Sequence, residues 1–156
     1  MAAMSDFLEN KLIDFLFRGQ ALGITGASAA AATGPTSLFY ALLTAAPADA
    51  GGGTEVTGGS YARVAVASSL ANYAGTQAAA SIVASSGTTG TTSNNGTITF
   101  PAPTANWGSV THFGIYDATA AGNLLFWGAL TTPKTVNNGD AAPSFAIGAF
   151  TLQIDN

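Results

Sequence analysis

The sequence of 156 residues contains no cysteine and very few charged residues. The absence of cysteine excludes disulfides, thiol chemistry and thiolate metal sites. Charged residues make up 8% of the chain, whereas an ordinary soluble domain has about 25%. The surface must therefore consist largely of Ser, Thr, Asn, Gly and Ala. Such a surface suits a protein packed against other protein, because the cores of interfaces are depleted in charge.

Positive charge is especially scarce and is not clustered. The formal net charge is −4, and the only basic residues are Lys11, Arg18, Arg63 and Lys134. Proteins neutralise nucleic-acid phosphates and anionic membrane surfaces with clusters of Lys and Arg. We therefore expect no nucleic-acid partner and no membrane partner. We also expect neither a signal peptide nor a membrane span, because no stretch combines the length, charge and apolarity that either requires.

Histidine, the usual general base, occurs once, as His112. In the strand predicted over residues 110–117, Asp117 lies five residues after His112 and therefore on the opposite face. That placement does not form a Ser-His-Asp triad, and no Gly-x-Ser-x-Gly elbow occurs in the sequence. We interpret His112 as a packed or hydrogen-bonded residue of a sheet.

Paired carboxylates of a glycosidase are the next possibility. The acidic residues outside the first predicted element are Asp49, Glu55, Asp117, Asp140 and Asp155. Three of them, Asp49, Asp117 and Asp140, stand in turn-like contexts where Asp is expected to form local hydrogen bonds. The pattern does not favour a two-carboxylate hydrolase.

Cofactor and metal motifs are missing as well. One histidine without cysteine excludes a zinc cage, and the turn over residues 137–140 has too few ligands to hold calcium alone. No P-loop or dinucleotide-binding fingerprint is present. We therefore predict no catalytic, cofactor-binding or metal-binding residues, no cofactor and no enzymatic activity.

Five aromatic side chains have two interpretations. They are Tyr61, Tyr73, Trp107, Tyr116 and Trp127. Stacking on sugars is one interpretation, and packing in the core or at an interface is the favoured one.

Residues 1–20 contain the only clear helical pattern. Apolar residues recur at helical spacing from Leu8 to Leu16, Ser5 or Asp6 can cap the start, and Gly19 is a natural stop. The helix either packs on its own domain or forms an arm that docks a neighbouring subunit. If it is an arm, deletion of residues 1–20 leaves the rest of the chain folded.

The remainder of the chain predicts a link followed by strands. Residues 21–36 are rich in Ala, Gly, Ser and Thr, which favours a flexible link. Short apolar runs separated by Gly, Asn and Pro then occur at residues 37–44, 61–67, 97–100, 110–117, 124–130, 134–136 and 149–155. The low-complexity stretch 84–96 is either an exposed loop or one arm of a hairpin. The chain is therefore expected to be mainly β: residues 37–156 form an antiparallel β-sandwich or jelly-roll-like domain after a short N-terminal helix.

Several blocks of sequence, taken together, resemble a known family. They are residues 8–20 (LENKLIDFLFRGQ), 93–107 (SNNGTITFPAPTANW), 110–117 (VTHFGIYD), 122–134 (GNLLFWGALTTPK) and 136–140 (VNNGD), together with residues 37–66. The chain resembles small virion proteins of tailed bacteriophages, which are labelled tail fibre proteins and are related to capsid decoration or cement proteins. The resemblance implies a structural protein of the virion, assembled in the bacterial host cytoplasm, and transfers no active-site residues.

Two virion roles fit this resemblance. We favour a capsid decoration or cement protein that binds the mature head lattice, with the major capsid protein or other virion proteins as partners, because a small, charge-poor chain suits such contacts. The alternative is a tail fibre or tail-tip protein that contacts the host receptor, although the sequence has no heptad seam or shaft repeat. Exposed strand edges and low charge favour a homo-oligomer in either role.

Overall fold

The computed structural model describes residues 4–23, 34–75 and 81–154. This part of the chain contains one helix, α1 (Asp6–Leu16), and nine strands. The strands are β1 (Ser37–Ala45), β2 (Thr54–Glu55), β3 (Val64–Ala67), β4 (Thr91–Ser93), β5 (Ile98–Thr99), β6 (Gly108–Tyr116), β7 (Leu124–Val136), β8 (Ser144–Phe145) and β9 (Thr151–Gln153). The prediction of a mainly β, antiparallel chain with a short N-terminal helix is confirmed. No helix in the described part is long and apolar enough to span a membrane.

The chain divides into two compact units, each assembled from separate segments. Unit 1 comprises Met1–Thr36, Ala67–Ile98 and Phe145–Asn156, and unit 2 comprises Ser37–Val66 and Thr99–Ser144. This grouping differs from the predicted division into residues 1–20, 21–36 and 37–156. The short strands β5 and β8 pair with each other in a separate two-stranded sheet.

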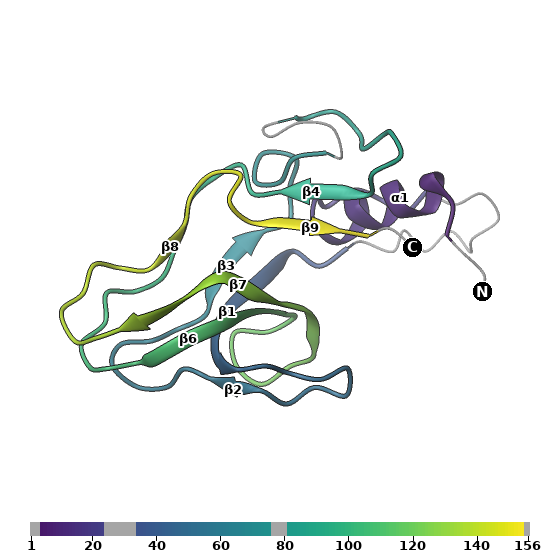
Figure 1. Cartoon of the computed structure of the whole chain (residues 1–156). Coiled ribbons are helices and arrows are strands. Elements are labelled where there is room, and N and C mark those ends of the chain that lie inside the picture. Colours follow the sequence, from purple (N-terminus) through teal and green to yellow (C-terminus); the bar gives the residue numbers. More distant parts are fainter. Residues whose placement is uncertain (1–3, 24–33, 76–80, 155–156) are drawn as a thin grey trace. The chain divides into compact units, whose positions relative to one another are not determined.

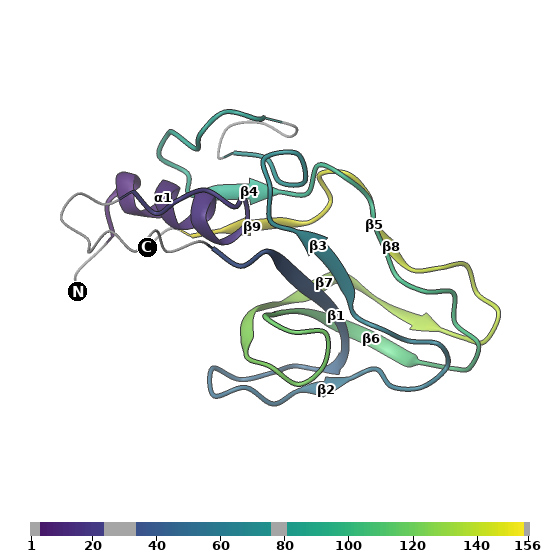
Figure 2. The same cartoon turned by 180° about the vertical axis from the view of Figure 1, so that it is seen from behind.

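Unit 2 is built around a sheet of five strands in the order β2-β1-β6-β7, with β3 also pairing with β1. Strands β1 and β6 lie side by side in the centre (Figures 1 and 2), where Tyr40 is opposite Ile115 and Leu42 is opposite Phe113. Strand β1 is buried on both faces from Tyr40 to Leu43, as its continuous apolar run predicts. These pairings form the core of unit 2.

Strand β7 is longer than the sequence predicted. Residues 124–130 and 134–136 were expected to be separate segments, but one strand runs from Leu124 to Val136 through Pro133. Within the described residues β7 pairs only with β6, so the missing N–H of Pro133 costs little on an edge strand.

Unit 1 contains α1 as part of its core. Ile13 and Phe17 are fully buried, and the Phe17 ring contacts the Tyr73 ring edge to face at 5.4 Å. The side-chain amide of Asn10 donates a hydrogen bond to the Gly87 carbonyl at 3.0 Å. The helix is therefore packed on its own unit, the first of the two interpretations above. Helical spacing revealed the apolar stripe, but not that Glu9, Asn10 and Asp14 are also buried.

A buried Arg18 joins the helix to the segment after Tyr73. Its side chain is fully buried and forms an ion pair with Asp14. The guanidinium also donates to the Ser81 and Val83 carbonyls, to the Ser85 hydroxyl and to the Tyr73 carbonyl. Arg18 therefore holds residues 81–85 against the helix through backbone groups.

The low-complexity stretch 84–96 contains the strand β4, which pairs with β9 in the register Thr91↔Gln153 to Ser93↔Thr151. Asn94 follows β4 and is buried rather than exposed in a turn. Its side chain donates to the Gly96 and Ala146 carbonyls and accepts a hydrogen bond from the Phe150 amide. The predicted link is described only over residues 21–23 and 34–36, which form no regular structure, and residues 24–33 lie outside the described part.

Candidate functional site

The residues considered for catalysis do not come together. His112 lies in the middle of β6, where its Nδ1 is 2.8 Å from the Thr111 hydroxyl and its ring is 6.1 Å from the Trp127 ring. Asp117 lies in an exposed loop, where its carboxylate accepts hydrogen bonds from the Asn123 amide and side chain. The hydrogen bond from the Asn123 side chain lowers the pKa of Asp117 most, and the bond from the Asn123 amide lowers it further. His112 and Asp117 therefore have separate local roles.

The other carboxylates occupy unrelated places. Asp140 accepts a hydrogen bond from the Asn137 amide within its turn, Asp49 is exposed, and Asp155 lies outside the described residues. Over the residues that the structure describes, no group of three or more His, Cys, Asp or Glu side chains is placed to hold a metal ion.

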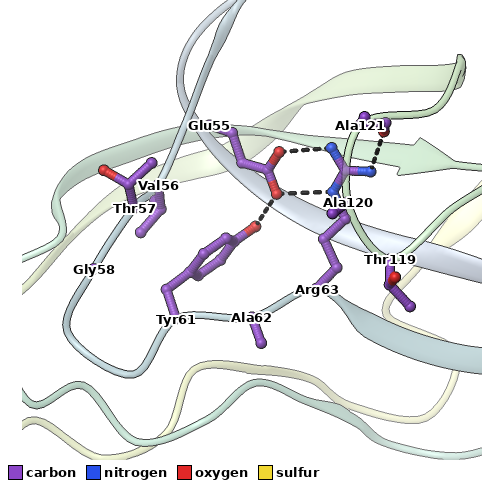
Figure 3. A pocket seen from close by; sticks show the side chains of 10 residues that line it. All are labelled: Glu55, Val56, Thr57, Gly58, Tyr61, Ala62, Arg63, Thr119, Ala120 and Ala121. Carbon is purple, nitrogen blue, oxygen red and sulfur yellow. Dashed lines mark hydrogen bonds and ion pairs between the residues drawn. The ribbon is translucent and has the colours of Figure 1, made fainter.

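Glu55 is the exception, because it lines a hollow in unit 2 of about 570 Å³. Figure 3 shows the hollow, which residues 55–58, 61–63 and 119–121 surround. The volume lies within the range of small-molecule sites, about 300–1,000 Å³. The loop after β6 and the segment between β2 and β3 form its two sides.

An ion pair between Glu55 and Arg63 forms one wall of the hollow. Arg63 Nε is 2.9 Å from Glu55 Oε1, and Nη2 is 2.7 Å from Oε2, so the contact is bidentate. The Tyr61 hydroxyl donates to the same Oε1 at 2.9 Å and accepts a hydrogen bond from the Leu42 amide. The Arg63 side chain is 7% exposed and that of Glu55 is 25% exposed, so the pair remains accessible on the Glu55 side.

Arg63 also fixes the loop after β6, which forms one side of the hollow. Its Nη1 donates to the Ala118 and Ala121 carbonyls, each at 2.8 Å, and the guanidinium lies 3.6 Å from the centre of the Tyr116 ring. A guanidinium stacked on an aromatic ring gains cation–π attraction. The shape of the hollow is therefore fixed by contacts within the protein.

The floor beneath Tyr61 is made by aromatic packing. The Trp107 ring meets the Tyr61 ring edge to face at 5.3 Å, and Trp107 Nε1 donates to the Gly59 carbonyl at 3.0 Å. Gly59 has φ +54°, and a Cβ there would lie 2.9 Å from Trp107 Nε1, so only glycine fits. Tyr61 and Trp107 therefore have the packing role that the sequence favoured, as does Tyr73 in unit 1.

Burial controls the ionisation of the tyrosines around this ion pair. Burial raises the pKa of Tyr61 strongly, and the adjacent Glu55 carboxylate raises it further. Burial also raises the pKa of Tyr116, again with a contribution from Glu55. The hydrogen bond to Glu55 raises the pKa of Arg63, so Arg63 keeps its positive charge in the ion pair.

These shifts predict a loss of stability at alkaline pH. Because both tyrosines have a higher pKa when folded than when unfolded, their contribution is complete below the unfolded value of about 10 and falls as the pH rises above it. The urea midpoint should decrease above about pH 10, and less steeply in Tyr61→Phe. Ionisation of every tyrosine near pH 10 in the folded protein, followed by tyrosinate absorbance, would contradict this prediction.

The exposed face of β7 is a second surface feature. Trp127 and Leu125 are 40% and 37% exposed, respectively, on a strand without charge from residue 124 to 133. Trp127 is therefore not a core residue, so of the two forms of packing expected from the sequence, in the core or at an interface, its exposure leaves the interface.

The Glu55–Arg63 pair was not predicted as a unit. Its two members are eight positions apart on segments that only the fold brings together. One signal was present: between Ala50 and Tyr116 they are the only charged residues. Opposite charges isolated in an uncharged stretch are expected to pair when they are partly buried.

The described residues form a β-rich, antiparallel fold with a hollow beside the Glu55–Arg63 pair. Comparison with family models places it among the structural proteins of bacteriophage virions. The chain belongs to the family described as podophage GP4 fiber I protein gp80, whose model matches residues 3–153. A comparison with curated proteins gave no significant match. The resemblance to small tailed-phage virion proteins is confirmed, and the family description fits the fibre alternative better than the favoured cement interpretation.

Proposed function

We propose that this protein is a component of a tail fibre, assembled into the particle in the bacterial host cytoplasm. The observation that supports the proposal is the match of a fibre-protein family over residues 3–153. This reverses the order of the two roles weighed from the sequence, where decoration of the capsid was preferred. The low charge that suggested packing against other protein fits a fibre subunit equally well.

Labelling of purified particles tests this location. Gold-conjugated antibodies raised against the protein should bind at the tail and leave the head surface unlabelled. Regularly spaced gold over the head would overturn the fibre proposal and support decoration of the capsid. Particles lacking the protein serve as the control for antibody specificity.

The outer edge of β7 suits pairing with a second copy of this chain. Over the described residues the strand has one neighbour, so its outer edge presents unpaired backbone groups that an extended segment can satisfy. Residues 124–133 carry no charge, so two copies of this edge do not repel each other. Pro133 and Lys134 interrupt the edge further on. Antiparallel pairing about a two-fold axis near Trp127 satisfies these constraints.

A charge on this edge is expected to weaken self-association. In Trp127→Lys, two like charges would face each other across the two-fold axis, so the dimer dissociation constant should rise about tenfold or more. Sedimentation equilibrium over a range of concentrations measures the constant.

Ile147→Lys is the matched control, because Ile147 is an exposed apolar residue of unit 1 and its change should leave the dissociation constant unaltered. A wild-type protein that stays monomeric, or one that associates as well with Lys at position 127, would exclude this edge as the contact.

A further inference from the structure

We propose that the hollow beside Glu55 and Arg63 binds a neutral saccharide. The inference deepens the proposed function, because a fibre subunit with such a site would contact a sugar on the host surface. The binding itself, however, is a property of unit 2 in solution. It follows from the charge, the free hydrogen-bonding capacity and the walls of the hollow.

The charge of the site excludes strongly ionic ligands. Glu55 and Arg63 neutralise each other through the bidentate contact, and no other charged side chain of the described residues lines the hollow. A phosphate or carboxylate approaching Arg63 would meet the Glu55 carboxylate, and an ammonium group approaching Glu55 would meet the guanidinium. A neutral ligand has neither penalty.

The donor and acceptor that the Glu55–Arg63 pair leaves unused suit a ligand that carries hydroxyl groups. Arg63 uses Nε, both N–H groups of Nη1 and one of Nη2, so one Nη2 donor has no partner among the described residues. Glu55 Oε2 accepts only the bond from Nη2 within the same residues, although a carboxylate oxygen can accept more than one. An unused donor therefore adjoins an unused acceptor. A hydroxyl group accepts and donates at once, so neighbouring hydroxyls of a sugar can use both.

The walls of the hollow complete a match to a sugar ring. Thr57 and Thr119 are exposed and supply hydroxyl groups on opposite sides of the site (Figure 3). Tyr61, Ala62 and Ala120 supply apolar surface between them. Sugar rings have apolar C–H faces and a rim of hydroxyls, and an amphipathic wall of this kind binds both.

The loop that carries Thr119 is already fixed by Arg63 through the Ala118 and Ala121 carbonyls. Binding therefore does not have to order this segment, which reduces the entropic cost of association. An open hollow with few free polar groups predicts weak binding, with dissociation constants of about 1–10 mM.

Titration of isotope-labelled protein with methyl glycosides tests the proposal. The probes are the neutral methyl glycosides of glucose, galactose, mannose and rhamnose, with methyl glucuronide and methyl glucosaminide as charged counterparts. At least one neutral glycoside should shift the amide resonances of residues 55–63 and 118–121 in a saturable way. Shifts confined to other residues, a preference for a charged probe, or no saturable shift with any neutral probe would overturn the proposal.

Threonine variants connect the shifts to this site. Thr57→Val and Thr119→Val each remove an exposed hydroxyl group and should weaken binding by about 2-fold to 10-fold, the equivalent of one hydrogen bond. Thr131→Val, an exposed change on β7, is the matched control and should bind as the wild type does. Unchanged binding in both hollow variants would contradict the assignment.

The proposals of a saccharide site and of a fibre location can be overturned independently of each other. Saturable binding together with gold labelling on the head would overturn only the fibre proposal. Tail labelling without any binding by the neutral glycosides would overturn only the saccharide site.

Discussion

Replacing Arg18 with methionine is expected to lower the free energy of unfolding by about 3–5 kcal/mol. The variant retains an unbranched apolar stem but removes a fully buried cation, which leaves the buried Asp14 carboxylate without its ion-pair partner. It also removes the donors that hold the Ser81 and Val83 carbonyls. Urea unfolding followed by circular dichroism measures the loss.

Two further variants test whether the buried pair is responsible. Lys134→Met removes an exposed cation and should change the stability by less than about 0.5 kcal/mol. Adding Asp14→Asn to the Arg18 variant should cost less than the sum of the two single changes, because the uncompensated charge disappears. A loss below about 1 kcal/mol in Arg18→Met would show that the ion pair does not stabilise unit 1.

Replacing Asn94 with alanine is expected to cost about 3 kcal/mol, because several polar groups lose their partner at once. The side chain is 1% exposed and bonds the Phe150 amide and the Ala146 carbonyl, which lie more than fifty positions away. The change should therefore loosen the attachment of β9 to β4, and hydrogen exchange at β9 should accelerate.

Asn138→Ala is the control for this substitution, because the Asn138 side chain is exposed. It should leave both the free energy of unfolding and the exchange of β9 unchanged. Equal stability of the two variants would mean that the buried amide can be replaced without loss.

The sequence predicted those strands whose burial alternates or whose apolar run is continuous. Strands β1 and β6 were found within two residues of their observed ends, and Phe150 is buried while Thr151 and Gln153 are exposed, as alternation required. Hydrophobic periodicity records one-sided burial directly. The two-residue strands β2 and β8 are too short to have a period, and β4 is a threonine-rich segment that pairs with distant β9.

The grouping of segments could not be predicted for a related reason. Helix α1 joins unit 1 through Arg18, whose partners lie 55 to 67 positions further along the chain. Local patterning says that residues 6–16 are helical, but contains no information on which distant carbonyls a buried cation binds. The same holds for Asn94, which has the sequence context of a turn residue and the position of a core residue.

The sequence pointed to individual residues of the candidate site, but not to how these residues are arranged. Glu55 was considered as a hydrolytic acid and Tyr61 as a stacking residue, whereas the structure joins them through a hydrogen bond of 2.9 Å. Arg63 stood out in the sequence only as one of the four basic residues. Their association depends on the pairing of β2 and β3 with β1, which no local spacing encodes.

Cryo-electron microscopy of intact particles tests most directly whether the protein is part of a tail fibre. We expect density for the five-stranded sheet of unit 2 in a fibre at the tail, with strand β7 of one copy beside β7 of a second copy. Density for this sheet on the head lattice, with none at the tail, would contradict the assignment of the chain as a fibre component.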